Sequence, residues 1–134
     1  MPILIAVPGQ KPAVIDDEVG LIDLGPTLVD LVGATPLPSF RGRSLLPALQ
    51  GNPLPGRPVF AELLPCTATP SHEVTIIEGG KKLTHKIGER RWELFDLTDD
   101  PRQQKNLADQ PAYRKQLDDL RAKLLAFEER NRRD

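Results

Sequence analysis

Few side chains in this sequence combine the type and the spacing that catalysis requires. His72 and His85 have no partner residue at the spacing of a metal site. His72 lies in a Pro-rich loop between two predicted strands, where it is either a contact for substrate or an ordinary surface histidine. We take His72 as the candidate for a substrate mouth, and we predict no catalytic, cofactor-binding or metal-ligating residue.

The acidic residues also admit two interpretations. Residues 16–18 are Asp-Asp-Glu, which could offer carboxylate oxygens to a hard cation. They precede a predicted helix, however, and a solvated acidic link is the expected structure there. Asp99 and Asp100 stand directly before Pro101 and are typical turn formers. Clustered carboxylate ligands are therefore not predicted.

Positive charge concentrates on one predicted hairpin, residues 81–91. A solvated outer face of a sheet is the ordinary interpretation of such charges. The alternative is a free-standing interaction module that binds an anionic polymer through this hairpin. No aromatic platform accompanies the charges, because Trp92 and Phe95 are expected in the core. The basic residues are Lys81, Lys82, Lys86, Arg90 and Arg91.

The composition indicates a folded chain without a global preference for polyanions. Of the 134 residues 39% are apolar, and 18 basic against 19 acidic residues give a net charge of −1. We therefore predict no nucleic-acid and no membrane partner. The single cysteine excludes an internal disulfide and leaves the compartment unknown. The 14 prolines, concentrated between residues 36 and 70, predict an extended connector.

Two elements are predicted near the N-terminus. The continuous apolar run Ile3–Val7 favours a strand buried on both faces, closed by Pro8-Gly9. This strand begins abruptly and has no partner strand, so we expect a piece cut from a larger domain. Asp23 is the predicted N-cap of a helix that ends at Gly33. The Pro-rich connector, 36–57, is expected to hold one helical turn.

The second half predicts an antiparallel meander and a helix. Strands are expected over 58–63, 73–78, 82–87 and 91–97, with two-residue turns at Gly79-Gly80 and, as type II′, at Gly88-Glu89. A helix over 111–132 should pack an apolar stripe on this sheet. The stripe consists of Tyr113, Leu117, Leu120, Leu124 and Phe127.

Four segments follow one another in an order that is specific as a set: Pro2-Ile3-Leu4-Ile5 with Pro8-Gly9; Asp23-Leu24-Gly25-Pro26-Thr27-Leu28-Val29 with Gly33; Gly42-Arg43-Ser44-Leu45-Leu46-Pro47; and Lys82-Leu83 with Glu93-Leu94-Phe95-Asp96-Leu97, Asp100-Pro101 and Asn106-Leu107. Their order resembles the C-terminal part of the sulfatase family, within the alkaline-phosphatase-like hydrolases. One departure is Gln103, where the family usually has Glu.

The resemblance implies a sulfuric-ester hydrolase of the arylsulfatase type whose chemistry lies upstream. Such enzymes use a formylglycine, made from the first residue of Cys/Ser-x-Pro-Ser-Arg, and a divalent, calcium-like cation. Cys66 begins Cys66-Thr67-Ala68-Thr69-Pro70, which loosely echoes that motif but has Pro70 in place of Arg. An ordinary loop cysteine is therefore expected. The resemblance thus places neither nucleophile nor metal ligands in this chain.

These observations combine into one expectation. The fold is α+β: a residual strand and helix of an α/β sandwich (1–35), the connector (36–57), and a small antiparallel sheet of about four strands packed by a C-terminal helix (58–134). The chain alone should be inactive. In a parent hydrolase it would help to shape the substrate mouth and pair with the missing N-terminal sulfatase domain. We also expect a homodimer, through the unpaired strand at residues 3–7.

Overall fold

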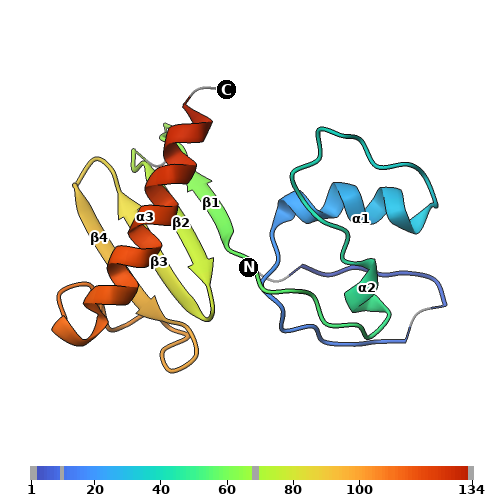
Figure 1. Cartoon of the computed structure of the whole chain (residues 1–134), viewed down its shortest axis with the longest axis horizontal. Coiled ribbons are helices and arrows are strands. Elements are labelled where there is room, and N and C mark those ends of the chain that lie inside the picture. Colours follow the sequence, from blue (N-terminus) through green and yellow to red (C-terminus); the bar gives the residue numbers. More distant parts are fainter. Residues whose placement is uncertain (1–2, 10, 68–69, 133–134) are drawn as a thin grey trace. The chain divides into compact units, whose positions relative to one another are not determined.

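The structure is a computed structural model that describes residues 3–9, 11–67 and 70–132. The chain forms two compact units, Met1–Gly56 and Arg57–Asp134, shown in Figure 1. Each unit has its own apolar cluster. The α+β class with a four-stranded antiparallel sheet and a C-terminal helix is confirmed. The finer division into 1–35, 36–57 and 58–134 stays a prediction.

The first unit contains three short helical elements. A 3-10 turn, η1 (Leu21–Asp23), leads directly into α1 (Leu24–Leu31), and α2 (Leu46–Leu49) is the single turn expected in the connector. Gly33 ends α1 with φ +68°, and the N–H of Ala34 donates to the carbonyl of Val29 at 3.0 Å. This left-handed stop is the C-terminal signal expected from the sequence.

Burial on α1 does not follow the apolar residues of its sequence. Pro26 and Thr27 are buried, whereas Leu28 and Val32 are 61% and 78% exposed. The small core of this unit lies elsewhere. It consists of Leu45, Ala48 and Leu54, packed by the half-buried Ile5, Ile15 and Val19.

The strand expected at residues 3–7 is not formed. The structure assigns no strand there, and Leu4 is 93% exposed. A strand is defined by its hydrogen-bonded neighbours, and a parallel strand buried on both faces requires one on each side. The described residues provide no such neighbour. Ile3, Ile5 and Val7 are half-buried, while Leu4 and Ala6 are exposed, so this segment buries alternate side chains only.

The second unit is the predicted meander. Its strands β1 (Val59–Leu63), β2 (Glu73–Glu78), β3 (Lys81–Lys86) and β4 (Arg91–Asp96) follow the chain order β1-β2-β3-β4, each antiparallel to the next. The register places Ile76 beside both Phe60 and Leu83, and Leu83 beside Leu94. These four side chains therefore lie in one row on one face of the sheet.

One of the two predicted turns is confirmed and the other is wrong. Gly79 and Gly80 take φ +58° and +72°, as a two-residue turn with two left-handed residues requires. Between β3 and β4, Lys86 pairs with Arg91, so the loop comprises four residues, 87–90. Its left-handed residue is Arg90, with φ +51°, and not Gly88. The longer loop closes with a bond from the Arg90 N–H to the Ile87 carbonyl at 3.2 Å.

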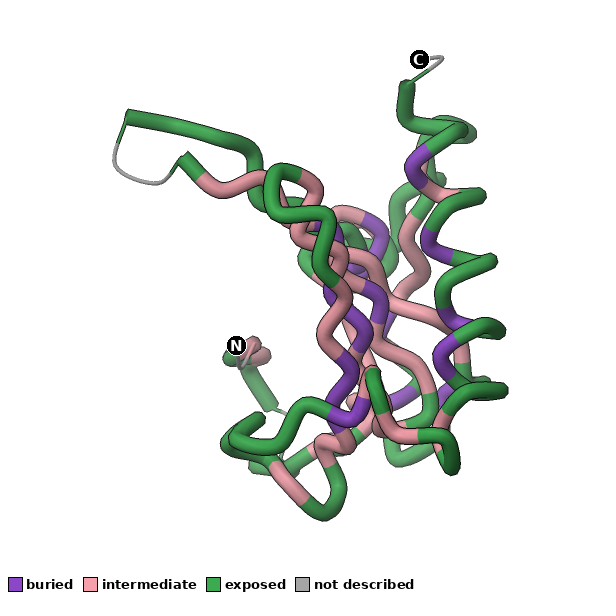
Figure 2. Tube along the Cα trace, turned by 90° about the vertical axis from the view of Figure 1, so that its left-hand side faces the viewer, coloured by how far each residue is buried: buried purple, intermediate pink, exposed green. Residues whose placement is uncertain are grey.

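The C-terminal helix covers one face of the sheet. It begins with a 3-10 turn, η2 (Pro111–Tyr113), and continues as α3 (Arg114–Asn131), which packs over β2 and β3. Figure 2 shows its buried residues on the side facing the sheet. Leu117, Leu120 and Leu124 are buried, and Phe127 stacks on Phe60 at 4.3 Å. The predicted stripe is confirmed. No described helix has the length and apolar character of a membrane span.

Candidate functional site

Two of the sequence motifs meet in a buried hydrogen-bonded junction within the first unit. The Asp23 side chain is fully buried and precedes α1. Its Oδ2 accepts the Gly20 N–H at 2.9 Å, and its Oδ1 accepts the Arg43 N–H at 2.8 Å. Asp23 was expected as the N-cap of α1, yet its carboxylate makes no capping bond to that helix. It instead ties the chain before the helix to the segment that follows Gly42.

Thr27 and Asp30 extend this junction along α1. The Thr27 hydroxyl donates to the Asp23 carbonyl at 2.5 Å and accepts the Leu45 N–H at 2.9 Å. One turn on, the Ser44 hydroxyl donates to Asp30 Oδ2 at 2.6 Å. The N–H groups of Arg43 and Leu45 are thus bound by the side chains of Asp23 and Thr27, and the Leu46 N–H donates to the Ser44 hydroxyl at 3.1 Å. Buried donors require such partners, so these motif residues position the backbone.

A close approach between two backbone segments explains why residue 42 of this junction is a glycine. A Cβ at this position would lie 2.0 Å from the carbonyl oxygen of Ile22 and 3.0 Å from the Asp23 nitrogen. Both atoms belong to the backbone, so the neighbour cannot swing aside. Gly25 is less confined, because a Cβ there would meet the ring of Phe40 at 3.3 Å. Only glycine at position 42 permits the Asp23–Arg43 bond.

His72 is the last residue of the loop before β2, and its side chain contacts the edge strand β1. Its Nε2 is 2.9 Å from Oε1 of Glu62, and the two side chains are 32% and 34% exposed. The His72 carbonyl accepts the Ile87 N–H at 3.0 Å, which fixes the backbone under the imidazole. A carboxylate bound to one ring nitrogen orients the ring and leaves the other nitrogen available for a ligand.

His85 has a different environment, on the helix-covered face of the sheet. Its Nδ1 lies 3.0 Å from Oε1 of the buried Glu128, and its ring stacks on Trp92 at 4.0 Å. Arg121 lies over the Trp92 ring at 4.8 Å from its centroid, and Arg132 is 3.6 Å from Glu128 Oε2. This cluster joins α3 to β3 and β4. Sequence reasoning missed it, because the two residues are far apart in the chain.

The basic hairpin is compensated by acidic and amide side chains. Lys81 Nζ donates to Asp96 Oδ2 at 2.7 Å, and this hydrogen bond is the main cause of the lowered pKa of Asp96. Arg91 lies 2.8 Å from Glu93. The remaining pairs are Lys82 with Gln103 at 2.6 Å, Lys86 with Glu93 at 3.3 Å and Arg91 with Glu89 at 3.3 Å. These pairs reduce the positive potential that a polyanion would meet.

The acidic turn after β4 is built as the sequence suggested. Asp96 Oδ1 accepts the Thr98 N–H at 3.1 Å, and Asp100 Oδ2 accepts the Lys105 N–H at 2.9 Å. Across 3–9, 11–67 and 70–132, no three His, Cys, Asp or Glu side chains are placed to hold a metal ion. Cys66 is an exposed free thiol in the loop after β1. The described residues therefore do not fit a divalent cation.

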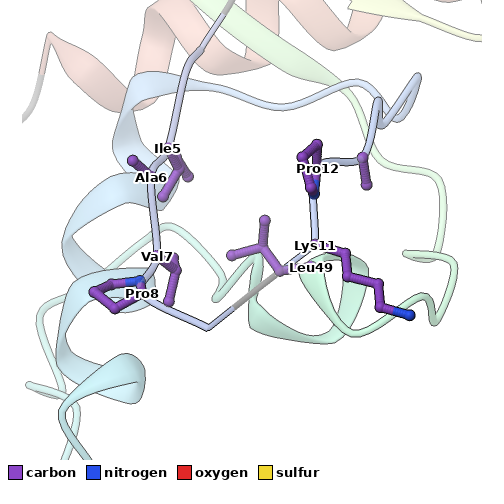
Figure 3. A pocket seen from close by; sticks show the side chains of 8 residues that line it. Ile5, Ala6, Val7, Pro8, Lys11, Pro12 and Leu49 are labelled. Atoms are coloured by element: carbon purple, nitrogen blue, oxygen red, sulfur yellow. The ribbon is translucent and has the colours of Figure 1, made fainter.

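One hollow of about 580 Å³ lies in the first unit (Figure 3). Its lining is almost entirely apolar, and Lys11 supplies the charged group at its rim. The described lining offers no carboxylate, histidine or thiol. This hollow can hold an apolar group but has no side chain suited to ester hydrolysis. It is lined by Ile5, Ala6, Val7, Pro8, Lys11, Pro12, Ala13 and Leu49.

One known protein family matches almost the whole chain. The family described as N-sulphoglucosamine sulphohydrolase, C-terminal, matches residues 1–130. The chain belongs to this family. It is thus a C-terminal sulfatase region, which confirms the resemblance inferred from the motifs. No curated protein matches the sequence.

Solved structures agree with this assignment. The chain is 32% identical to a Bacteroides thetaiotaomicron protein described as a sulfatase, with a TM-score of 0.71. The match covers 82% of this chain and 24% of that protein's chain. A 2-O GAG sulfatase gives the same identity, score and coverage. A phosphonate monoester hydrolase from Silicibacter pomeroyi is 28% identical at a TM-score of 0.70, over 94% of this chain and 28% of that one. The chain therefore spans about a quarter of these hydrolases.

Proposed function

We propose that this chain is the C-terminal region of a sulfatase that hydrolyses sulfuric esters, and that its catalytic residues belong to an upstream domain. The family match over residues 1–130, at about a quarter of the length of the similar hydrolases, carries this proposal. Because one similar structure is a 2-O GAG sulfatase, we propose a sulfated sugar as the substrate class. Simple aryl sulfates are the test substrates for the arylsulfatase-type chemistry.

The family implies a formylglycine and a divalent, calcium-like cation in the parent enzyme. When bound, the cation would stabilise negative charge on the sulfate oxygens. The described part of this chain has no ligand cluster for it, so we assign this chain a structural role. The chain would cover the catalytic domain and contribute loops to the substrate mouth, since specificity often resides in loops on a rigid scaffold.

His72 is the residue we propose for that mouth. It is partly exposed, held by Glu62, and adjacent to the loop that joins β1 to β2. An oriented imidazole can donate a hydrogen bond to a sulfate or hydroxyl oxygen of the substrate. His72→Ala in the full-length enzyme should raise KM for a sulfated sugar and leave the metal content unchanged. Thr67→Ala, in the same loop, is the matched control, and equal kinetics for the two variants would remove His72 from the mouth.

Two measurements test the proposed function as a whole. The coding sequence upstream should contain a Cys/Ser-x-Pro-Ser-Arg motif, and the longer protein should release sulfate from a sulfated sugar. The 134-residue chain alone should release none. Turnover of nitrophenyl sulfate by the chain alone, abolished by Cys66→Ala, would refute the proposal and make Cys66 a nucleophile.

The similarity to a phosphonate monoester hydrolase supports a second candidate activity. That protein matches over 94% of this chain, more than either sulfatase does. Parallel assays of the longer protein with a sulfate ester and a phosphonate monoester separate the two, because the ratio of kcat/KM values reports the preferred ester. A preference for the phosphonate would replace the sulfatase proposal.

Two further proposals concern partners. Binding of an anionic polymer through residues 81–91 has less support, because Lys81, Lys82, Lys86 and Arg91 all have partners. A steep salt dependence of heparin binding by this chain would favour it.

A homodimer of the isolated chain is supported by exposed apolar side chains in the first unit, including Leu4 and Val14 at 93% and 89%.

A further inference from the structure

The two edges of the four-stranded sheet are treated differently by the rest of the second unit. In an antiparallel pair, residues that exchange both backbone hydrogen bonds alternate with residues that exchange none. The two-residue turn makes Glu78 and Lys81 a bonded pair. Alternation from this pair means that the backbone groups of β1 that bond to β2 are those of Val59, Ala61 and Leu63. The N–H and C=O groups of Phe60 and Glu62 therefore point away from the sheet.

The same count places the Trp92 and Leu94 backbone groups at the outer edge of β4, and these groups have partners. The Leu94 N–H donates to Asn106 Oδ1 at 3.0 Å, and the Leu94 carbonyl accepts the Leu107 N–H at 2.8 Å. The Asn106 side-chain amide donates to the Trp92 carbonyl at 3.4 Å. This protected edge confirms the alternation, because only outward-facing groups take partners outside the sheet.

The β1 edge has no comparable cover from the described residues of its own unit. None of the backbone hydrogen bonds outside the sheet ladder involves Phe60 or Glu62. β1 also lacks the devices that protect natural edges, since its register with β2 is continuous and it contains neither lysine nor proline. Its one charge, Glu62, is held by His72. An edge of this kind is a template for a further strand.

The sequence of β1 fixes which strand fits best. A second β1, antiparallel and centred on Ala61, pairs each Phe60 with the Glu62 of the other copy, and each such pair exchanges two hydrogen bonds. The same register sets Val59 against Leu63, both apolar. Centring on Glu62 would set two carboxylates against each other, and centring on Phe60 would pair Glu62 with Pro58, which has no N–H. The register centred on Ala61 is therefore favoured.

We infer that β1 is a self-association surface, through which two copies of this chain join their sheets about a two-fold axis at Ala61. A two-fold pairing closes on itself and leaves neither β1 edge open. The α3 helices do not obstruct it, because α3 packs mainly over β2 and β3 and meets β1 through the stack of Phe127 on Phe60, over the face of the sheet and not at its hydrogen-bonding edge. This inference depends on the geometry of the second unit and not on the proposed sulfatase function, and it uses a different surface from the apolar segment at residues 3–7.

The experiment compares two substitutions at one position. Proline at residue 62 removes the outward N–H but no bond to β2, so β1 should remain in its own sheet. Glu62→Ala is the matched control, because it loses the same side chain and keeps the N–H. Sedimentation equilibrium of the whole chain over a concentration series should show a dimer whose Kd is raised about ten-fold or more by Glu62→Pro relative to Glu62→Ala.

Amide exchange gives a second, local readout. The N–H groups of Phe60 and Glu62 should gain protection as the concentration rises, while that of Ala61, bonded to β2, stays constant. Ala61→Lys should weaken the dimer by opposing two cations at the axis, and Ala122→Lys, on the exposed side of α3, should not. A monomer at every concentration refutes the inference. A dimer that survives Glu62→Pro but is lost on Leu4→Asp also refutes it, and points to segment 3–7.

Discussion

Gly42→Ala is the substitution that tests the buried junction most directly. The added Cβ would lie 2.0 Å from the carbonyl oxygen of Ile22, well inside van der Waals contact. Because the obstacle is backbone, segment 42–45 must move away from η1 and the start of α1. That movement breaks the 2.8 Å bond from the Arg43 N–H to Asp23 and the 2.9 Å bond from the Leu45 N–H to Thr27.

The size of the effect follows from two contributions. Overpacking a tight site costs about 1–3 kcal/mol. Leaving a buried carboxylate or amide unsatisfied costs about 1–3 kcal/mol more. The sum, roughly 2–6 kcal/mol, is a large share of the ~5–15 kcal/mol that stabilises a typical domain. The Gly42→Ala chain should therefore open the first unit while the second unit stays folded.

Native-state hydrogen exchange is the appropriate assay, because it resolves local opening. Protection of the Arg43 and Leu45 amides should fall roughly 30-fold or more, at about ten-fold for each 1.4 kcal/mol. Leu83 and Leu94, in the second unit, should be unaffected. Gly56→Ala is the control, since a Cβ there meets no atom within 4 Å. If Gly42→Ala exchanges like Gly56→Ala, the junction does not hold the unit together as argued.

Three further predictions concern the second unit. Leu120→Ala, which truncates a buried side chain of α3, should cost about 2–5 kcal/mol in the free energy of unfolding and clearly lower Tm, whereas the exposed Lys115→Ala should not; equal Tm values would show that the stripe is not packed. The hydrogen bond from Lys81 lowers the pKa of Asp96, so the stability that this bond contributes is present above the pKa of the unfolded state and is lost as the pH falls through the folded-state pKa. Asp96→Asn should not show this loss of stability in acid, and a pH profile identical to that of the unmodified chain would show that the Lys81–Asp96 bond is not its cause. Arg90→Gly should raise the unfolding midpoint in urea slightly, since glycine relieves the left-handed strain at φ +51°, and a lower midpoint would show that the arginine side chain matters more than its backbone.

The parts of the fold that the sequence predicted are those fixed by local chemistry. Gly79 and Gly80 accept positive φ without steric cost, and the two-residue turn between them sets the register of β2 and β3. The four-and-three spacing of Leu117, Leu120 and Leu124 defines one helix face whatever lies opposite. These signals need no knowledge of distant residues, which is why the meander and α3 follow from the sequence.

The errors arose where the outcome depends on partners far along the chain. Residues 3–7 have the composition of a buried strand, but no neighbour supplies their backbone with hydrogen bonds. Gly88 favoured a two-residue turn, yet pairing of Lys86 with Arg91 moved the left-handed position to Arg90. The pairing of His85 with Glu128 could not be found by spacing, because α3 meets β3 only in the folded unit.

The motifs that identify the family have a common physical basis in this chain. Asp23 accepts two backbone N–H groups, Gly42 allows a backbone contact, and Asn106 bonds both the N–H of Leu94 and the carbonyl of Trp92. Each satisfies or makes room for a backbone group that no neighbouring strand or helix turn serves. A substitution there leaves a backbone polar group without its partner, which costs about 1–3 kcal/mol where that group is buried. The most recognisable residues of the chain are thus those that hold its irregular backbone in place.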